Sequence, residues 1–234
     1  MDRSPSVASR VERRIVRRPG RAFTFADFAD LPASAVAPAL SRLTKAGTIR
    51  RARKGVYYAP RRTVLGEVPF DPIEVGRAAS AVPVYPAGLS AASMLGLTTQ
   101  VPARAELVVE GRRTTAPGAV ELKSRHGTRR ADLTAPEAAL LEVLRDLDRF
   151  TDLSPTDTVE RLEVVVRSPE SRRRLLRAAG GEPPRVRAMV GALAEHAGAS
   201  ESELRRLRSS LNPTSRFEFG PLKELSAAKG WRAR

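Results

Sequence analysis

The stretch SAVAPALSRLTKAGTIRRARKGVYY, residues 34–58, decides the fold of the N-terminal part of the chain. Val36, Leu40 and Leu43 recur at intervals of four and three residues, the spacing of a helix with one buried face. The polar residues between them belong to the opposite face. Gly47 follows the last apolar residue, where a left-handed helix end favours glycine. The pattern therefore predicts a helix over residues 34–46 with one packed and one exposed face.

Ser34 and Pro38 indicate different starts for this helix. Ser34 is a good N-cap, since its hydroxyl can accept a backbone hydrogen bond. With that cap, Pro38 falls at the fourth helical position, where it forfeits the first intrahelical hydrogen bond. The sequence thus favours a start at Ser34 and leaves open a start one or two residues later.

A basic hairpin is expected directly after the helix. Residues 48–51 have a short strand pattern, residues 53–55 can form a tight turn, and residues 56–59 are expected to return as a strand that Pro60 ends. A helix followed by such a hairpin is the outline of a winged helix-turn-helix. In that fold the helix enters the major groove of DNA and the wing contacts phosphates.

Two further helices are expected before this segment. Over residues 6–18, Val7, Val11 and Ile15 point inward, and the arginines point outward: Arg10, Arg13, Arg14 and Arg17. These arginines either reach phosphates or form the charged exterior of any surface helix. Thr24 is expected to cap a second helix over residues 24–31, whose phenylalanines are expected in the core.

Candidate DNA contacts follow from the exposed side of the helix and from the hairpin. Small apolar side chains suit thymine methyl groups, serine and arginine can hydrogen-bond base edges, and basic hairpin residues suit phosphates. Arg42 has the alternative of an ordinary surface ion pair. The candidate set is Ser34, Ala35, Pro38, Ser41, Arg42, Lys45, Arg50, Arg51, Arg53, Lys54 and Tyr57.

Positive charge is concentrated in the N-terminal part of the chain that contains this helix and hairpin. The net charge is +15, and residues 1–69 hold 15 basic and 5 acidic side chains against 26 and 21 in the rest. Such clustering favours nucleic-acid contact over an arginine-rich composition throughout the chain. The chain has no cysteine, which excludes disulfides and thiolate chemistry. No signal peptide or membrane helix is expected, so the sequence predicts a cytoplasmic protein without a membrane partner.

The fold class predicted for the whole chain is α+β and mostly helical, in two domains. Residues 1–66 form the winged helix-turn-helix, residues 61–72 a linker, and residues 70–234 a larger domain. That domain is expected to contain helices over residues 71–81 and 87–97, a small sheet near residues 104–125, and helices from about residue 134 onward. Capping boxes are expected at Thr134 with Glu137 and at Ser200 with Glu203. Trp231 is expected to anchor a terminal helix.

The sequence contains few residues that could form a catalytic site. His126 and His196 are the only histidines, and neither has the spacing of a metal ligand set. There is no glycine-rich phosphate loop and no nucleophile motif. We therefore expect no enzyme activity, no cofactor and no metal.

The motifs LSRL (40–43), KAGTIRR (45–51) and RKGVYYAP (53–60) resemble the N-terminal domain of the AbiEi-type antitoxins of bacterial type IV toxin–antitoxin systems. The resemblance extends through YPAGLSAASMLGLTTQVP (85–102), ELVVEG (106–111) and LTAPEAALLEVLRDL (133–147). It covers residues 6–150; from Leu153 onward the chain departs from the pattern.

This resemblance implies a sequence-specific autorepressor that binds double-stranded operator DNA at inverted repeats. It further implies a cognate nucleotidyltransferase-like toxin, encoded by the second gene of the operon, with which no stable complex is required. A homodimer on DNA would need half-sites separated by whole turns, about 10 base pairs each. The alternative is an RNA-binding or toxin-neutralising adaptor that uses the same basic domain.

Overall fold

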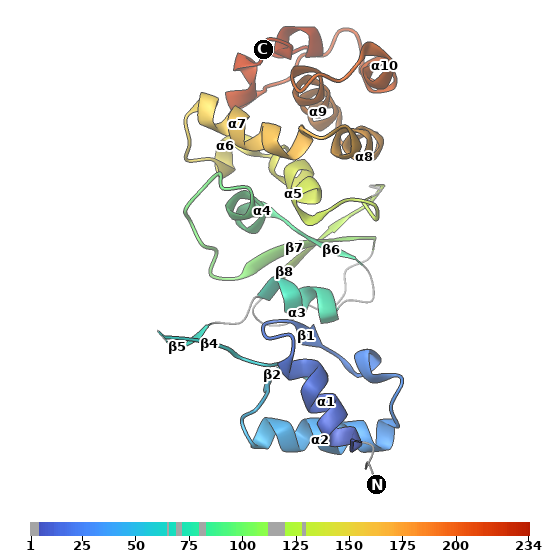
Figure 1. Cartoon of the computed structure of the whole chain (residues 1–234). Helices are drawn as coiled ribbons and strands as arrows, with labels where there is room; N and C mark the ends of the chain where they lie inside the picture. The colour runs from blue at the N-terminus through green and yellow to red at the C-terminus, as the bar shows by residue number, and fades with distance from the viewer. Residues whose placement is uncertain (1–4, 65, 69–71, 80–82, 112–119, 128–129) are drawn as a thin grey trace. The chain divides into compact units, whose positions relative to one another are not determined.

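The computed structural model describes residues 5–64, 66–68, 72–79, 83–111, 120–127 and 130–234 (Figure 1). The fold class is α+β and mostly helical, as predicted. The chain divides into two compact units, the first formed by Met1–Ala81 with Ala116–Val120 and the second by Val82–Thr115 with Glu121–Arg234. Each unit has its own cluster of buried apolar residues.

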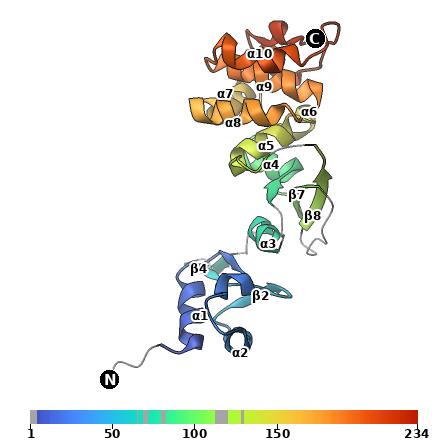
Figure 2. The same cartoon turned by 90° about the vertical axis from the view of Figure 1, so that its right-hand side faces the viewer.

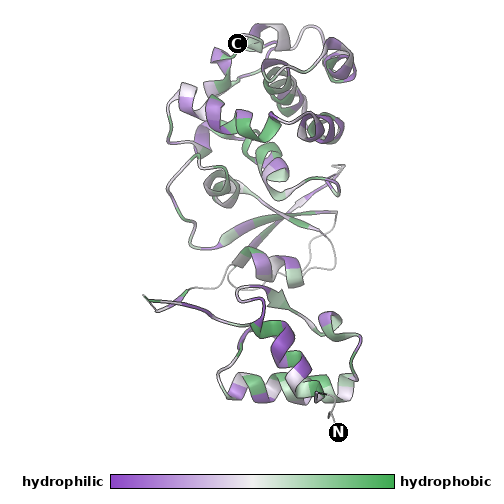
Figure 3. Ribbon diagram, in the orientation of Figure 1, coloured by the Kyte–Doolittle hydropathy of each residue, from purple (hydrophilic) through white to green (hydrophobic). Residues whose placement is uncertain are grey.

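Helix α1 (Val7–Val16) begins the first unit where the sequence predicts a helix. The Ser6 side chain caps it by accepting a hydrogen bond from the backbone N–H of Ser9. Val11 and Ile15 are buried, and α1 packs against α2 (Ala33–Lys45). Figure 3 shows hydrophilic and hydrophobic residues alternating along α1, as expected for a helix with one buried face.

The second predicted helix is a single 3₁₀ turn, η1 (Phe25–Phe28). The Asp27 carboxylate accepts a hydrogen bond from the Thr24 backbone N–H at 2.7 Å, which closes a capping box. Phe28 and Leu31 are buried as expected, whereas Phe25 is 42% exposed. Pro32 disfavours helical backbone at Leu31, which limits how far the turn could extend toward α2.

The start of α2 was predicted incorrectly. The helix begins at Ala33, and Pro32, not Ser34, occupies the N-cap position without a side-chain hydrogen bond. Pro38 lies inside the helix and does not delay its start. Pro38 lacks the N–H that would bond the carbonyl of Ser34, and both residues are exposed, so water can satisfy that carbonyl. Gly47 follows the helix with φ +73°, as predicted.

The basic hairpin is present, with its first strand two residues later than predicted. Strands β2 (Arg50–Arg53) and β3 (Val56–Tyr58) pair antiparallel around the turn Lys54–Gly55, in which Gly55 has φ +82°. Strand β1 (Ala22–Phe23) pairs with the other edge of β3, giving the order β1-β3-β2. The central strand β3 therefore has its backbone paired on both sides.

The predicted linker at residues 61–72 is wrong, because these residues contain a second hairpin. Strands β4 (Arg61–Thr63) and β5 (Gly66–Val68) pair antiparallel, and Gly66 adopts φ +115° at the turn. Strands of three residues are too short to show a recognisable alternation. Helix α3 (Pro72–Ala79) follows, and its Ala78 packs against Ala22 and Val56 of the first unit.

The second unit contains the predicted small sheet and helical region. Strands β6 (Val84–Pro86), β7 (Ala105–Glu110) and β8 (Val120–Arg125) form the sheet in the order β6-β7-β8. Helices α4 (Gly88–Met94) and α5 (Ala135–Val143) pack on it, and the helices beyond follow layer by layer (Figures 1 and 2). These are α6 (Leu147–Phe150), α7 (Pro155–Val166), α8 (Pro169–Ala179), α9 (Pro184–His196) and α10 (Glu201–Ser209).

Sequence signals at helix starts in this unit were confirmed. Thr134 with Glu137 and Ser200 with Glu203 form the predicted capping boxes. The C-terminal segment adds two 3₁₀ helices, η2 (Gly220–Glu224) and η3 (Ala228–Trp231). Trp231 is fully buried, so the predicted anchor is present, although the helix that carries it is 3₁₀.

Buried charge in the second unit is paired. Arg130 is 1% exposed, and its guanidinium donates to Glu142 Oε1 at 2.6 Å and to Glu182 Oε1 at 2.5 Å. Arg125 and Arg145 supply further donors to the same two carboxylates. The network thus satisfies charges that would otherwise be costly to bury. In the part of the chain described, no helix has the length and apolar character needed to span a membrane.

Candidate nucleic-acid interface

One face of α2 is exposed along its whole length. Val36, Ala39 and Leu40 are buried against the core of the first unit. The exposed residues recur at intervals of three and four on the opposite side, which makes them one continuous stripe. We call this stripe the α2 face; it consists of Ser34, Ala37, Pro38, Ser41, Arg42 and Lys45.

Arg42 is the long basic side chain near the middle of the α2 face. Its Nε donates to the carbonyl of Pro38 at 3.4 Å, which lays the side chain along the helix. Among the residues with described placement it forms no ion pair, so the structure does not support the alternative of a surface pair. Ala35 is only half-buried and lies beside the face, not on it.

The β2–β3 hairpin presents a second group of basic side chains. Arg50, Arg51 and Lys54 are exposed and Arg53 is half-buried. Arg50 forms an ion pair with Glu67 of the second hairpin at 3.4 Å, between groups 46% and 36% exposed. Since such exposed pairs contribute little, this one leaves Arg50 available to another anion.

Tyr57, which the sequence pattern predicts as a DNA contact, does not belong to this surface. It is 9% exposed and part of the buried cluster of the first unit, with its ring in edge contact with Phe25 at 6.5 Å between centroids. Its position on the central strand β3 explains the burial. We therefore exclude Tyr57 from the candidate interface.

The segment between Asp30 and Glu67 contains basic residues and no acidic ones. This segment contains α2, the β2–β3 hairpin and β4. Its basic residues are Arg42, Lys45, Arg50, Arg51, Arg53, Lys54, Arg61 and Arg62. A segment with eight basic and no acidic residues attracts phosphate backbones irrespective of base sequence.

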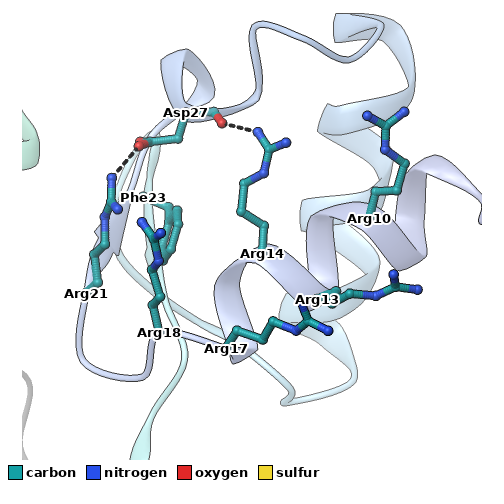
Figure 4. Close-up of a pocket in the computed structure, with 8 residues that line it drawn as sticks. All are labelled: Arg10, Arg13, Arg14, Arg17, Arg18, Arg21, Phe23 and Asp27. Carbon is teal, nitrogen blue, oxygen red and sulfur yellow. Dashed lines mark hydrogen bonds and ion pairs between the residues drawn. The ribbon is translucent and has the colours of Figure 1, made fainter.

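A hollow of about 460 Å³ lies between α1 and the segment that carries β1 and η1 (Figure 4). We call it the arginine hollow, because six of the eight side chains that line it are arginines. The lining residues are Arg10, Arg13, Arg14, Arg17, Arg18, Arg21, Phe23 and Asp27.

Arg14 is held firmly at one side of the hollow. Its guanidinium donates to both carboxylate oxygens of Asp30, at 2.7 and 2.8 Å, and to the carbonyl of Asp27 at 2.5 Å. The hydrogen bond from Arg14 lowers the pKa of the Asp30 carboxyl to about 2. The same hydrogen bond raises the pKa of Arg14. Both groups are therefore charged at every pH at which the protein would function.

The other arginines of the hollow differ in their partners. Arg21 donates to Asp27 at 3.0 Å and lies over the ring of Phe23 at 5.0 Å, and Arg10 contacts Asp30 at 3.3 Å. Within the described ranges, no ion pair is formed by Arg13, Arg17 or Arg18. The sequence could not reveal this hollow, because Arg18 and Arg21 lie beyond the helical period and only folding brings them beside α1.

Among the described residues, neither histidine forms a site with other titratable groups. His126 is exposed after β8, and His196 lies 4.0 Å from Glu163 near the end of α9. Across the described part of the chain, no three histidine, aspartate or glutamate side chains converge in a way that could hold a metal ion.

Comparison with protein-family models and with curated proteins finds no match to this chain. Among solved structures, the chain is similar to the crystal structure of the RV2827C protein from Mycobacterium tuberculosis. The two share 20% sequence identity with a TM-score of 0.48, over 92% of this chain and 84% of that chain. At that level of similarity we draw no functional conclusion from it.

Proposed function

We propose that this chain is a sequence-specific DNA-binding protein and not an enzyme, and that its first unit is a winged helix-turn-helix. In this proposal the α2 face lies in the major groove and the β2–β3 hairpin is the wing. The observation that carries it is the exposed α2 face followed directly by a basic hairpin, in a segment without an acidic residue. The order of helix, turn, helix and hairpin in the first unit supports the same fold.

The composition of the α2 face suits close approach to base pairs. Ala37 and Pro38 are small or compact apolar residues that can contact thymine methyl groups. Ser41 and Arg42 follow on the same face and can hydrogen-bond base edges; an arginine fork matches the O6 and N7 acceptors of guanine. We therefore assign base reading to Ser41 and Arg42.

The hairpin suits the phosphate backbone. Lys54 is at the turn of the β2–β3 hairpin, and Arg50 and Arg51 are exposed on β2. A lysine ammonium is a point charge without the fork geometry that base recognition uses, so Lys54 fits a phosphate contact. These contacts would position α2 without contributing sequence preference.

The motif resemblance supports a more specific role. We propose that the protein is an autorepressor of AbiEi antitoxin type, which binds inverted repeats upstream of its own operon as a homodimer on DNA. Its functional partner would be a nucleotidyltransferase-like toxin. The remaining candidate contacts on α2, Ser34 and Lys45, would flank the base-reading residues, with Ala35 beside them.

A competition assay tests this proposal against the RNA-binding or adaptor alternative. Labelled duplex from the upstream region is bound by the full chain and challenged with unlabelled native duplex, scrambled duplex or folded RNA of equal charge. The proposal predicts that scrambled duplex and RNA compete only at about a thousandfold or greater excess over native duplex. Equal or better competition by RNA would favour the alternative and contradict a repressor.

A further inference from the structure

The arginine hollow carries more positive charge than the fold itself neutralises. Six arginines line it, and among the residues with described placement the acidic groups in contact with them are Asp27 in its wall and Asp30 beside it. Two carboxylates leave a net charge of about four on this small surface. Several of the arginines are four residues apart along the chain, a spacing at which like charges destabilise a helix.

The helix dipole explains only part of this arrangement. Arg13, Arg14 and Arg17 lie in and just after the last turn of α1, where cations interact favourably with the partial negative charge of a helix end. That partial charge is about half an elementary charge, so it cannot balance the cluster. Arg18 and Arg21 lie beyond the helix and gain less from it.

The paired arginines give the hollow a fixed wall. Arg14 is held by three hydrogen bonds, and Arg21 is held between the carboxylate of Asp27 and the ring of Phe23. Beside them, Arg13, Arg17 and Arg18 are exposed and form no ion pair among the described residues. Some guanidinium groups of the hollow are therefore already held in place, and others are free to bind. An anion can enter such a site with little reorganisation of the protein.

The donors and the wall also restrict the chemistry of the ligand. Guanidinium forks match pairs of phosphate oxygens. The only aromatic side chain in the wall, Phe23, is 1% exposed, so no ring is presented on which a base could stack. The hollow therefore favours phosphate groups themselves, whatever they are attached to.

We propose that the arginine hollow is a binding site for phosphate groups, formed by residues other than those of the α2 face and the β2–β3 hairpin. The phosphates are supplied either by a free polyphosphate-bearing molecule or by the backbone of bound nucleic acid. This site does not depend on the α2 face reading DNA.

Titration calorimetry of the full chain with inorganic tripolyphosphate tests the proposal. The test variant combines Arg13→Gln, Arg17→Gln and Arg18→Gln, which removes the three unpaired charges. The control variant combines Arg167→Gln, Arg205→Gln and Arg216→Gln, which removes three exposed charges of the second unit that form no ion pair in the described part of the chain. Far-UV circular dichroism verifies that both variants are folded; if the triple variant is not, Arg17→Gln and Arg18→Gln are tested singly.

We expect wild type and control to bind tripolyphosphate at one site and the test variant to bind at least tenfold more weakly. Equal binding by test and control variants, or no binding by wild type, would overturn the proposal. A second titration distinguishes the source. Weaker binding of scrambled duplex by the test variant than by the control variant assigns the site to the nucleic-acid backbone, and equal duplex binding by the two variants assigns it to a free polyphosphate.

These outcomes are separable from those of the proposed function. Loss of tripolyphosphate binding in the test variant, together with no preference of wild type for upstream duplex, would support the hollow and contradict the repressor. If wild type prefers upstream duplex and the test and control variants bind tripolyphosphate equally, the repressor is supported and the hollow is contradicted.

Discussion

Gly191 and Trp231 are closely packed in the second unit. A Cβ atom at Gly191 would lie 2.3 Å from two carbons of the Trp231 ring, so this α9 position admits only glycine while the ring is in place. The indole Nε1 donates to Glu195 at 2.6 Å, and Arg208 lies over the ring at 4.8 Å. The contact joins the C-terminal segment to α9.

We predict that Gly191→Ala destabilises the second unit despite the better helix propensity of alanine. The propensity gain is about 1 kcal/mol, whereas overpacking costs about 1–3 kcal/mol and displaces a fully buried ring. Urea unfolding monitored by the fluorescence of Trp231, the only tryptophan, measures the change. Gly230→Ala is the matched control, because its Cβ would meet no atom within 4 Å. A Gly191→Ala variant as stable as wild type would refute the fit.

The lowered pKa of Asp30 predicts that the stability of the first unit depends on pH. The pKa of the Asp30 carboxyl in the folded protein is about 2, lowered from an ordinary value of 3.8, so its pairing stabilises the fold above pH 3.8. That stabilisation is lost as the pH falls from 3.8 toward 2. Asp30→Asn should therefore lower the free energy of unfolding at neutral pH, and the difference from wild type should shrink over this range.

Denaturant unfolding followed by circular dichroism at a series of pH values measures this difference. Glu12→Gln on α1, the helix that carries Arg14, is the control, since Glu12 is exposed and forms no ion pair among the described residues. A difference between Asp30→Asn and wild type that grows on acidification would show that the Arg14–Asp30 pair is not the cause.

At the scale of the element, the sequence predicted what depends on local pattern and failed where tertiary pairing decides. The exposed and buried sides of α2, the capping boxes and the basic hairpin follow from spacing alone. The β4–β5 hairpin and β6 did not, because their strands of three residues show no period. Strand β3 is equally short, but the turn before it and Pro60 after it marked its ends. The start of α2 was misplaced because Ser34 was taken as the N-cap, a position that Pro32 occupies; Pro38 is tolerated on the exposed face and does not delay the start.

The same distinction applies to the candidate site. Most exposed residues of the α2 face were predicted from the helical period, since a packed stripe implies an open one. Tyr57 was predicted as a contact but is buried, because the pairing of β3 on both edges cannot be read from its neighbours in sequence. The arginine hollow was missed for a related reason: Arg21 joins it through the fold, not through the period of α1.

The proposed roles of α2 in base reading and of the hairpin in phosphate binding predict different mutant phenotypes. Arg42→Ala should reduce the preference for native over scrambled duplex, by about 1–3 kcal/mol if it pairs with a guanine. Lys54→Ala should weaken binding to both duplexes equally and reduce the salt slope by about one. Fluorescence anisotropy with both duplexes measures these effects. Equal losses of preference in the two variants would remove the assignment of roles.

At the scale of the whole molecule, the two buried clusters predict two separable cores. Leu40 is fully buried in the first cluster and Leu193 in the second. Leu40→Ala should destabilise the first unit by about 2–5 kcal/mol and leave the Trp231 fluorescence transition unchanged. Leu193→Ala should shift that transition. Thermal unfolding followed by circular dichroism and fluorescence measures both, and a fluorescence shift of equal size in Leu40→Ala would show that the units unfold as one.

The central claim, that the α2 face reads base sequence, is tested most directly by the salt dependence of specificity. The affinity of the full chain for upstream duplex and for scrambled duplex is measured by anisotropy over a series of salt concentrations. Backbone contacts weaken with salt by a logarithmic slope of about −0.9 per phosphate neutralised, and base contacts do not. We predict that affinity for scrambled duplex falls steeply while the preference for upstream duplex persists at high salt. Equal affinities that vanish together as salt rises would contradict the claim and leave charge attraction alone.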